Sequence, residues 1–238
     1  MSGHSKWSTI KRKKAVIDAQ RGKAFTKIIK EISVAARVGG GDPNANPRLR
    51  TLLDKAKAAN MPLENITRAI KKGTGELPGT HYEPHVYEGY GPNGIAVIVD
   101  TLSDNKNRTV AELRHLFTAK GGSLGETNSV NWMFERMGVI HTNTNGMTED
   151  VLLEKLLDFE INDIKLEEGA FVIYCNSKSL DVVKHAAEQL GLKVESAELE
   201  WVAKNSTSLD DTQSEKALEF LSELEDLDDV QNVYTNLA

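Results

Sequence analysis

The 238-residue sequence lacks several features that define whole classes of protein. It has one cysteine, Cys175, so no disulfide can form within the chain, and we expect a reducing compartment. Its longest apolar runs, such as 94–99 and 170–174, are far shorter than the roughly 18 residues of a membrane span. Residues 1–14 lack the apolar core of a signal peptide, so we expect a cytoplasmic protein that makes no membrane contact.

Motifs for catalysis and cofactor binding are also missing. The letters of 89–94 match G-x-G-x-x-G, but a strand is expected to follow them instead of a helix, so a hairpin turn is predicted. His81, Glu83 and His85 lie in a loop where their spacing does not bring the side chains onto one face, and we predict no metal site. No nucleophile–base pair or carboxylate pair stands out. We therefore predict a protein that is not an enzyme and needs no cofactor.

The charge of the chain is divided unevenly along its length. The formal net charge is −6, which by itself argues against a polyanionic partner. However, residues 1–80 hold 17 Lys and Arg against 6 Asp and Glu, a net charge of +11, whereas residues 81–238 hold 12 against 29, a net charge of −17. Such asymmetry indicates nucleic acid as the partner of the basic part. The acidic part would repel phosphate and could instead recruit a protein partner.

The first third of the chain predicts a basic arm followed by a three-helix bundle, roughly residues 19–73. Apolar residues at three- and four-residue spacing predict a first helix, which the glycines at 39–41 end. Asn46 and Pro47 are typical of a helix start, and Pro62 opens a third helix that Gly73 closes. Residues 74–83 are rich in turn-forming residues and are interpreted as a linker.

The remainder predicts two α/β domains. Strands at 85–90 and 95–102 and a helix around 110–117 begin the middle domain. From 130 to 202 the expected order is βαββαβ, which is the ferredoxin-like unit. A Ser/Thr-rich linker at 205–214 then leads to a helix at 215–227 and a strand at 230–235, which have no sheet of their own. We therefore predict an α+β multidomain fold in which domain 131–204 is inserted into a middle domain built from 81–130 and 205–238, behind an N-terminal domain of residues 1–80.

The candidate nucleic-acid contacts lie in the arm and the helical domain. Lys and Arg supply the sequence-independent attraction to phosphate, and Trp7 could stack on a base. The short turn before Pro62 is compatible with a helix-turn-helix whose second helix carries Asn65, although any three-helix bundle uses similar turns. The alternative for the arm is a solvated tail. The predicted contact residues are His4, Lys6, Trp7, Lys11, Arg12, Lys13, Lys14, Arg21, Lys23, Lys27, Arg48, Arg50, Arg68, Lys71 and Lys72.

Seven stretches of the sequence resemble the YebC/PmpR family. In chain order they are GHSKW (3–7), GGGDPNANPRLR (39–50), NMPLENITRAIKKG (60–73), YEGYGPNG (87–94), SDNKNRTVAELRH (103–115), GGSLG (121–125) and NWMFERMG (131–138). The resemblance implies an N-terminal helical domain and two α/β domains, the ferredoxin-like one inserted in the middle one. It also implies a probable DNA-binding transcriptional regulator, although other members activate translation on ribosomes, and it brings no catalytic residues.

Three functional hypotheses follow. The first is a transcriptional regulator that binds promoter DNA through the basic helical domain and arm. The second is a translation factor that binds ribosomal RNA through the same surface; the absence of an established operator-reading motif favours it. The third is an enzyme with a site between the α/β domains, which only a deep pocket with converging polar groups would support.

Overall fold

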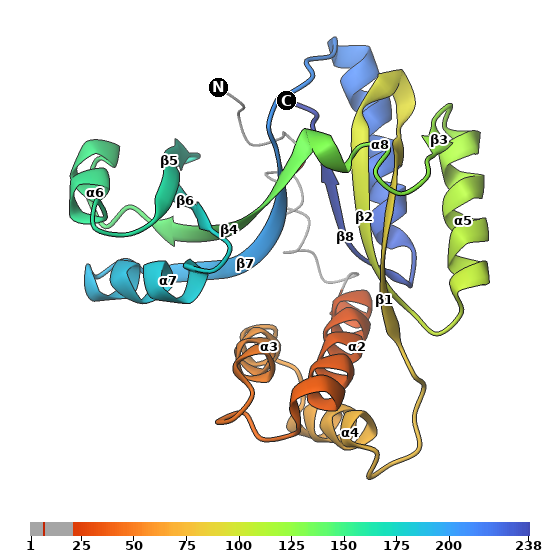
Figure 1. The fold of residues 1–238 in the computed structure, drawn as a ribbon, viewed down its shortest axis with the longest axis horizontal. Coiled ribbons are helices and arrows are strands. Elements are labelled where there is room, and N and C mark those ends of the chain that lie inside the picture. The colour runs from red at the N-terminus through yellow and green to blue at the C-terminus, as the bar shows by residue number, and fades with distance from the viewer. Residues whose placement is uncertain (1–6, 8–20) are drawn as a thin grey trace. The chain divides into compact units, whose positions relative to one another are not determined.

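The computed structural model describes Trp7 and residues 21–238, and it confirms the predicted α+β fold (Figure 1). The chain divides into two compact units. The first holds the described residues up to Trp132 together with Asn205–Ala238, and the second is Met133–Lys204. The first unit contains the helical bundle and a four-stranded sheet, and the second contains the other four-stranded sheet.

The bundle consists of α2 (Arg21–Gly39), α3 (Pro47–Ala58) and α4 (Leu63–Thr74). Asn46 caps α3 as predicted, because its side-chain oxygen accepts a hydrogen bond from the amide of Leu49 at 3.0 Å. Buried side chains from all three helices form a single core. They include Ile28, Ile32, Leu49, Leu52, Ile66 and Ala69.

The predicted role of Gly73 is wrong. Helix α4 continues to Thr74, and the residue that ends it is Gly75, which has the left-handed φ of 84°. A Cβ on Gly73 would lie 2.4 Å from the carbonyl oxygen of Ser33, so glycine is needed there for the close crossing of α2 and α4.

The middle sheet has the strand order β3-β1-β2-β8. Its strands are β1 (Glu83–Tyr90), β2 (Ala96–Ser103), β3 (Ser123–Leu124) and β8 (Val230–Thr235). Residues 91–94 form the predicted hairpin turn between β1 and β2, with the 3-10 turn η2 (Pro92–Gly94) inside it. Strand β8 pairs with β2, so the end of the chain completes a sheet that 83–103 begins.

Two helices cover one face of this sheet, α5 (Lys106–Ala119) and α8 (Asp211–Asp226). Phe117 of α5 meets Phe220 of α8 edge-on, with ring centroids 4.9 Å apart. Helix α8 starts four residues earlier than the predicted Glu215, because Asp210 and Gln213 form a capping box inside the segment interpreted as a linker.

The second unit begins after the short turn η3 (Asn131–Met133) and has the predicted ferredoxin-like order. Its sheet order is β5-β6-β4-β7, with every neighbouring pair antiparallel. The core lies between the sheet and the two helices, where Leu152, Phe171 and Val183 are fully buried. The elements are β4 (Phe134–Asn143), α6 (Glu149–Lys155), β5 (Ile161–Glu167), β6 (Ala170–Asn176), α7 (Leu180–Gln189) and β7 (Val194–Ala203).

Candidate nucleic-acid interface

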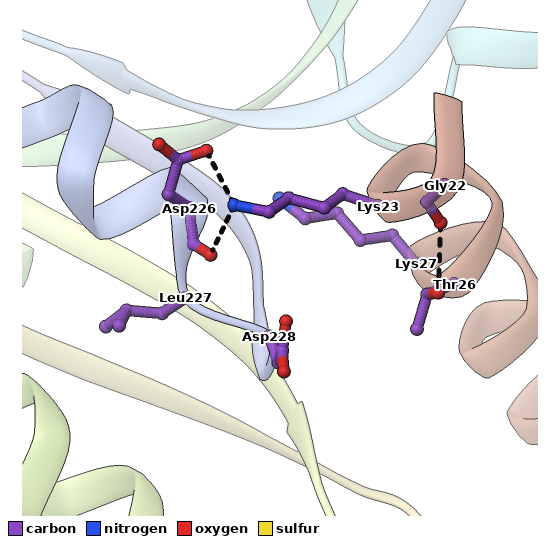
Figure 2. Close-up of a pocket in the computed structure, with 7 residues that line it drawn as sticks. All are labelled: Gly22, Lys23, Thr26, Lys27, Asp226, Leu227 and Asp228. Atoms are coloured by element: carbon purple, nitrogen blue, oxygen red, sulfur yellow. Dashed lines mark hydrogen bonds and ion pairs between the residues drawn. The ribbon is translucent and has the colours of Figure 1, made fainter. Parts of the chain in front are cut away.

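Three lysines of α2 contact the C-terminal end of α8 and the turn that follows it. Lys23, Lys27 and Lys30 recur at spacings of four and three residues, so they share one side of the helix, and we call them the inward basic stripe. Lys23 Nζ donates to the carbonyl oxygen and Oδ1 of Asp226 at 3.3 and 3.2 Å (Figure 2). Lys27 Nζ donates to the carbonyl oxygen of Glu225 at 3.0 Å.

These contacts cap the C-terminal end of α8. The last carbonyls of a helix have no partner inside the helix and carry its partial negative charge, so lysines stabilise that end. Figure 2 shows Lys23 reaching across to Asp226 with Lys27 beside it. A pocket of about 110 Å³ adjoins the contact. It is lined by Gly22, Lys23, Thr26, Lys27, Asp226, Leu227 and Asp228.

Lys30, the third member of the stripe, is buried against Asp229. Its Nζ lies 3.0 Å from Asp229 Oδ1, and the two side chains are 8% and 3% exposed. Lys30 also donates to the carbonyl oxygen of Asp228 at 2.8 Å and lies over the ring of Tyr82, 5.1 Å from its centroid. The helical bundle is thereby joined to the turn between α8 and β8.

Asp229 accepts hydrogen bonds from several elements of the middle domain. Arg108 approaches its Oδ2 at 2.6 Å, Thr109 at 2.8 Å and Ser103 at 3.0 Å. Burial alone would raise the pKa of Asp229, but the hydrogen bonds from Arg108, Lys30, Thr109 and Ser103 outweigh burial and lower it to about 2. The carboxylate is therefore held in its charged form.

A second group of basic side chains points outward. All seven Lys and Arg residues of α3 and α4 are exposed, whereas these helices carry only two acidic residues, Asp54 and Glu64. Lys57 pairs with Asp54 at 3.4 Å, and Arg68 pairs with Glu64. We call the group the outward basic surface. Its members are Arg48, Arg50, Lys55, Lys57, Arg68, Lys71 and Lys72.

Comparison with known proteins places this architecture in a family. The model of the TACO1/YebC N-terminal domain matches residues 5–76, and the model of the TACO1/YebC second and third domains matches residues 82–237. The chain belongs to the TACO1/YebC family. The predicted family resemblance is confirmed.

Relatives in this family match over almost the full chain. A protein of Chlorobaculum tepidum named probable transcriptional regulatory protein is 51% identical over 100% of this chain and 95% of its own. A protein of Trichlorobacter lovleyi with the same description is 52% identical over 99% of this chain and 95% of its own. The crystal structure of a conserved hypothetical protein from Aquifex aeolicus superposes with a TM-score of 0.85 at 46% identity, covering 94% of this chain and 93% of that one.

Within the TACO1/YebC fold, the position of Trp7 corrects our expectation of an exposed aromatic ring. Trp7 is 2% exposed and belongs to the core between the middle sheet and its helices. Its indole Nε1 donates to the carbonyl oxygen of Val233 at 3.3 Å. A ring that is buried in this way has no free face for stacking on a base.

The other predicted contact residues fall into three groups. His4, Lys6, Lys11, Arg12, Lys13 and Lys14 lie outside the described residues, and Arg21 is the first residue of α2. Lys23 and Lys27 belong to the inward basic stripe, so their ammonium groups already have partners. Arg48, Arg50, Arg68, Lys71 and Lys72 are exposed on α3 and α4. Lys23 is exposed as well, but only the five residues on α3 and α4 lie away from the contact with α8.

Alternative sites gain little support from the part of the chain that the structure describes. No set of three or more potential metal ligands converges there, and Glu83 lies 3.7 Å from His81 and 3.9 Å from His85. Burial raises the pKa of the Cys175 thiol to about 11, so it is protonated at neutral pH. No helix among residues 21–238 is long and apolar enough to cross a bilayer.

Sequence reasoning missed the cluster around Asp229. Asp229 follows an acidic run at the end of α8, which is typical of a solvated surface, yet it is buried and joins α2, β2 and α5. One signal was available in the sequence: the stretch 103–109 combines Ser, Arg and Thr, which are suitable donors for a carboxylate. Nothing local indicates that the carboxylate comes from 120 residues further along the chain.

Proposed function

We propose that this TACO1/YebC-family protein is a regulator that binds nucleic acid through the outward basic surface of α3 and α4, together with the basic residues of the arm. The observation that carries the proposal is the exposure of all seven basic side chains on these two helices. Exposed Lys and Arg side chains attract phosphates through counterion release, which needs no base-specific contact.

The charge distribution supports a single binding region. The segment 47–74 carries a net charge of +5, whereas residues 81–238 carry −17. A polyanion would therefore be attracted to the helical domain and repelled by the rest of the chain. The difference in charge between the two parts would orient the protein on its target before any specific contact forms.

Promoter DNA is the target we favour, because the relatives are named probable transcriptional regulatory proteins. Ribosomal RNA is the second candidate, because one observation argues against base-specific reading of a promoter. On α4, the helix proposed to read bases, Arg68 is already paired with Glu64 and Asn65 is half-buried. Binding would then depend on phosphate, which DNA and RNA share.

The deciding experiment compares two sets of lysines and arginines. The outward variant is Arg48→Gln, Arg50→Gln, Lys71→Gln and Lys72→Gln, and the matched inward control is Lys23→Gln with Lys27→Gln. Binding to duplex DNA is measured by fluorescence anisotropy at several salt concentrations. If all four outward residues contact phosphate, the slope of log K against log salt becomes less steep by about 3 to 4.

The inward control should leave that slope close to the wild-type value, because Lys23 and Lys27 are engaged with α8. An unchanged slope for the outward variant would remove α3 and α4 from the proposed interface. Promoter duplex, scrambled duplex and ribosomal RNA are compared at one salt concentration. Stronger binding to ribosomal RNA, together with co-sedimentation with ribosomes, would replace the transcriptional role by the translational one.

A further inference from the structure

The ferredoxin-like unit carries an exposed apolar strip where α6 meets the edge strand β5. Leu153, Leu157 and Leu166 are 43%, 67% and 52% exposed, whereas the neighbouring Leu152 and Leu156 are fully buried in the core. Figure 1 shows α6 beside β5 in this unit. We call the three exposed residues the leucine strip.

The three leucines share one side of the α6–β5 junction. Leu153 and Leu157 lie one and two turns after Glu149, so the three residues fall on the same side of the helix and the turn that continues it. Glu149 Oε1 accepts a hydrogen bond from the amide of Leu166 at 2.9 Å, which shows that this side faces the edge of β5. The leucine strip therefore draws its residues from two elements that a hydrogen bond joins.

Strand addition at this edge is disfavoured. The amide of Ile164 donates to Asp163 Oδ1 at 3.0 Å, and the amide of Leu166 donates to Glu149. With both N–H groups occupied, an incoming strand finds few donors on β5. What remains available to a partner is the apolar contact of the leucine side chains.

The charges around the leucine strip specify the partner. Residues 149–168 contain eight acidic and two basic residues, a net charge of −6. This acidity repels nucleic acid and also opposes pairing of the strip with a second copy of itself. It matches a partner that combines apolar side chains with Lys and Arg. The acidic residues are Glu149, Asp150, Glu154, Asp158, Glu160, Asp163, Glu167 and Glu168.

We propose that the leucine strip docks a cationic amphipathic helix of another protein. Apolar side chains at i and i+4 of that helix cover Leu153, Leu157 and Leu166, and its flanking Lys and Arg side chains meet the acidic rim. The contact lies in the unit 133–204 and does not depend on the outward basic surface. One protein would then hold nucleic acid with its basic domain and a protein partner with its acidic inserted domain.

The test uses the full-length chain and a synthetic probe. The probe is a fluorescent peptide with leucines at i, i+4 spacing and lysines between them, and its control is a scrambled peptide of the same composition. Leu153→Ser with Leu157→Ser should weaken binding of the probe by about tenfold or more. Val182→Ser is the matched control, because Val182 is 58% exposed on α7, outside the strip, and it should bind as wild type.

Several outcomes would overturn the proposal. Equal binding of the probe and the scrambled peptide would show that charge alone attracts the probe. Equal binding of the probe by the double variant and the wild type would show that the leucine strip is not the docking site. If circular dichroism shows that the double variant is unfolded, Leu166→Ser on β5 provides the same test from a different element. A dimer of the wild type that the double variant abolishes in sedimentation would assign the strip to self-association instead. The outward variant tested against DNA should bind the probe normally, which separates the two proposals.

Discussion

The helical domain presents two sets of basic side chains that differ in what surrounds them. The inward basic stripe of α2 meets the C-terminal end of α8 and the buried carboxylate of Asp229. The outward basic surface of α3 and α4 faces solvent. Both sets look alike in the sequence, since each places Lys or Arg at helical spacing beside apolar residues.

The comparison shows that one cationic residue type can have two physical roles. A lysine against a helix C-terminus or a buried carboxylate fixes the position of its own helix. A lysine in solvent keeps its counterions and can exchange them for phosphates. We infer that the inward stripe orients the bundle on the middle domain, which leaves α3 and α4 to contact a ligand.

Removal of the buried carboxylate should have the largest effect on stability. Asp229→Ala leaves Lys30 buried without its ion pair and removes the acceptor of Arg108, Thr109 and Ser103. We expect the free energy of unfolding to fall by about 3–5 kcal/mol, measured by urea denaturation followed by circular dichroism.

Lys23→Ala is the matched control for that measurement. Its ion pair with Asp226 is about half exposed on both sides, so we expect a loss of about 1 kcal/mol or less. Equal effects of the two substitutions would mean that the buried end of the stripe is no more important than the exposed end.

Truncation of the buried indole should have the next largest effect. Trp7→Ala opens a cavity beside Val233 and removes the hydrogen bond of Nε1, so we expect the middle domain to lose about 3 kcal/mol in thermal or urea unfolding. Trp7→Phe, which keeps an aromatic ring in the core, should lose less. If Trp7→Ala weakened DNA binding without changing stability, the ring would act at the ligand and not in the core.

Acidification should remove a smaller, defined part of the stability. The folded-state pKa of Asp229 is about 2, below the ordinary value of 3.8, so the charged carboxylate stabilises the fold above the unfolded-state pKa. That contribution, about 2 kcal/mol, is lost as the pH falls from about 4 to about 2. The free energy of unfolding of the wild type and of Asp229→Asn is measured between roughly pH 2 and pH 6. The variant should lack the loss of stability that titration of Asp229 causes in the wild type. An identical pH profile for the variant would assign the acid sensitivity to other carboxylates.

Much of the fold could be predicted from local pattern. The Asn46–Pro47 start of α3, the strand Val230–Thr235 and the βαββαβ order of the inserted unit all appear where the periodicity and caps indicate them. These features depend on neighbours within a few residues, which are visible in the sequence. The start of α8 was also encoded locally, in Asp210 and Gln213, but a Ser/Thr-rich composition obscured it.

The candidate interface could be predicted only in part. The sequence predicted a basic first third of the chain and five of the seven exposed basic residues of α3 and α4, and it left out Lys55 and Lys57. It could not show that Lys23 and Lys27 meet α8, or that Trp7 reaches Val233, because these partners lie about 200 residues away. Contacts of that separation leave no periodic signal in either segment.

The sequence by itself thus determined the type and order of the main secondary-structure elements, without the two-residue strand β3, the membership of the chain in its family and the opposite charge of its two parts. Only the tertiary structure decided which basic residues point inward, which glycine ends α4 and which packs against α2, and where the buried charge lies. The physical reason is that helix and strand formation respond to near neighbours, whereas burial and ion pairing depend on which distant segments the fold brings together.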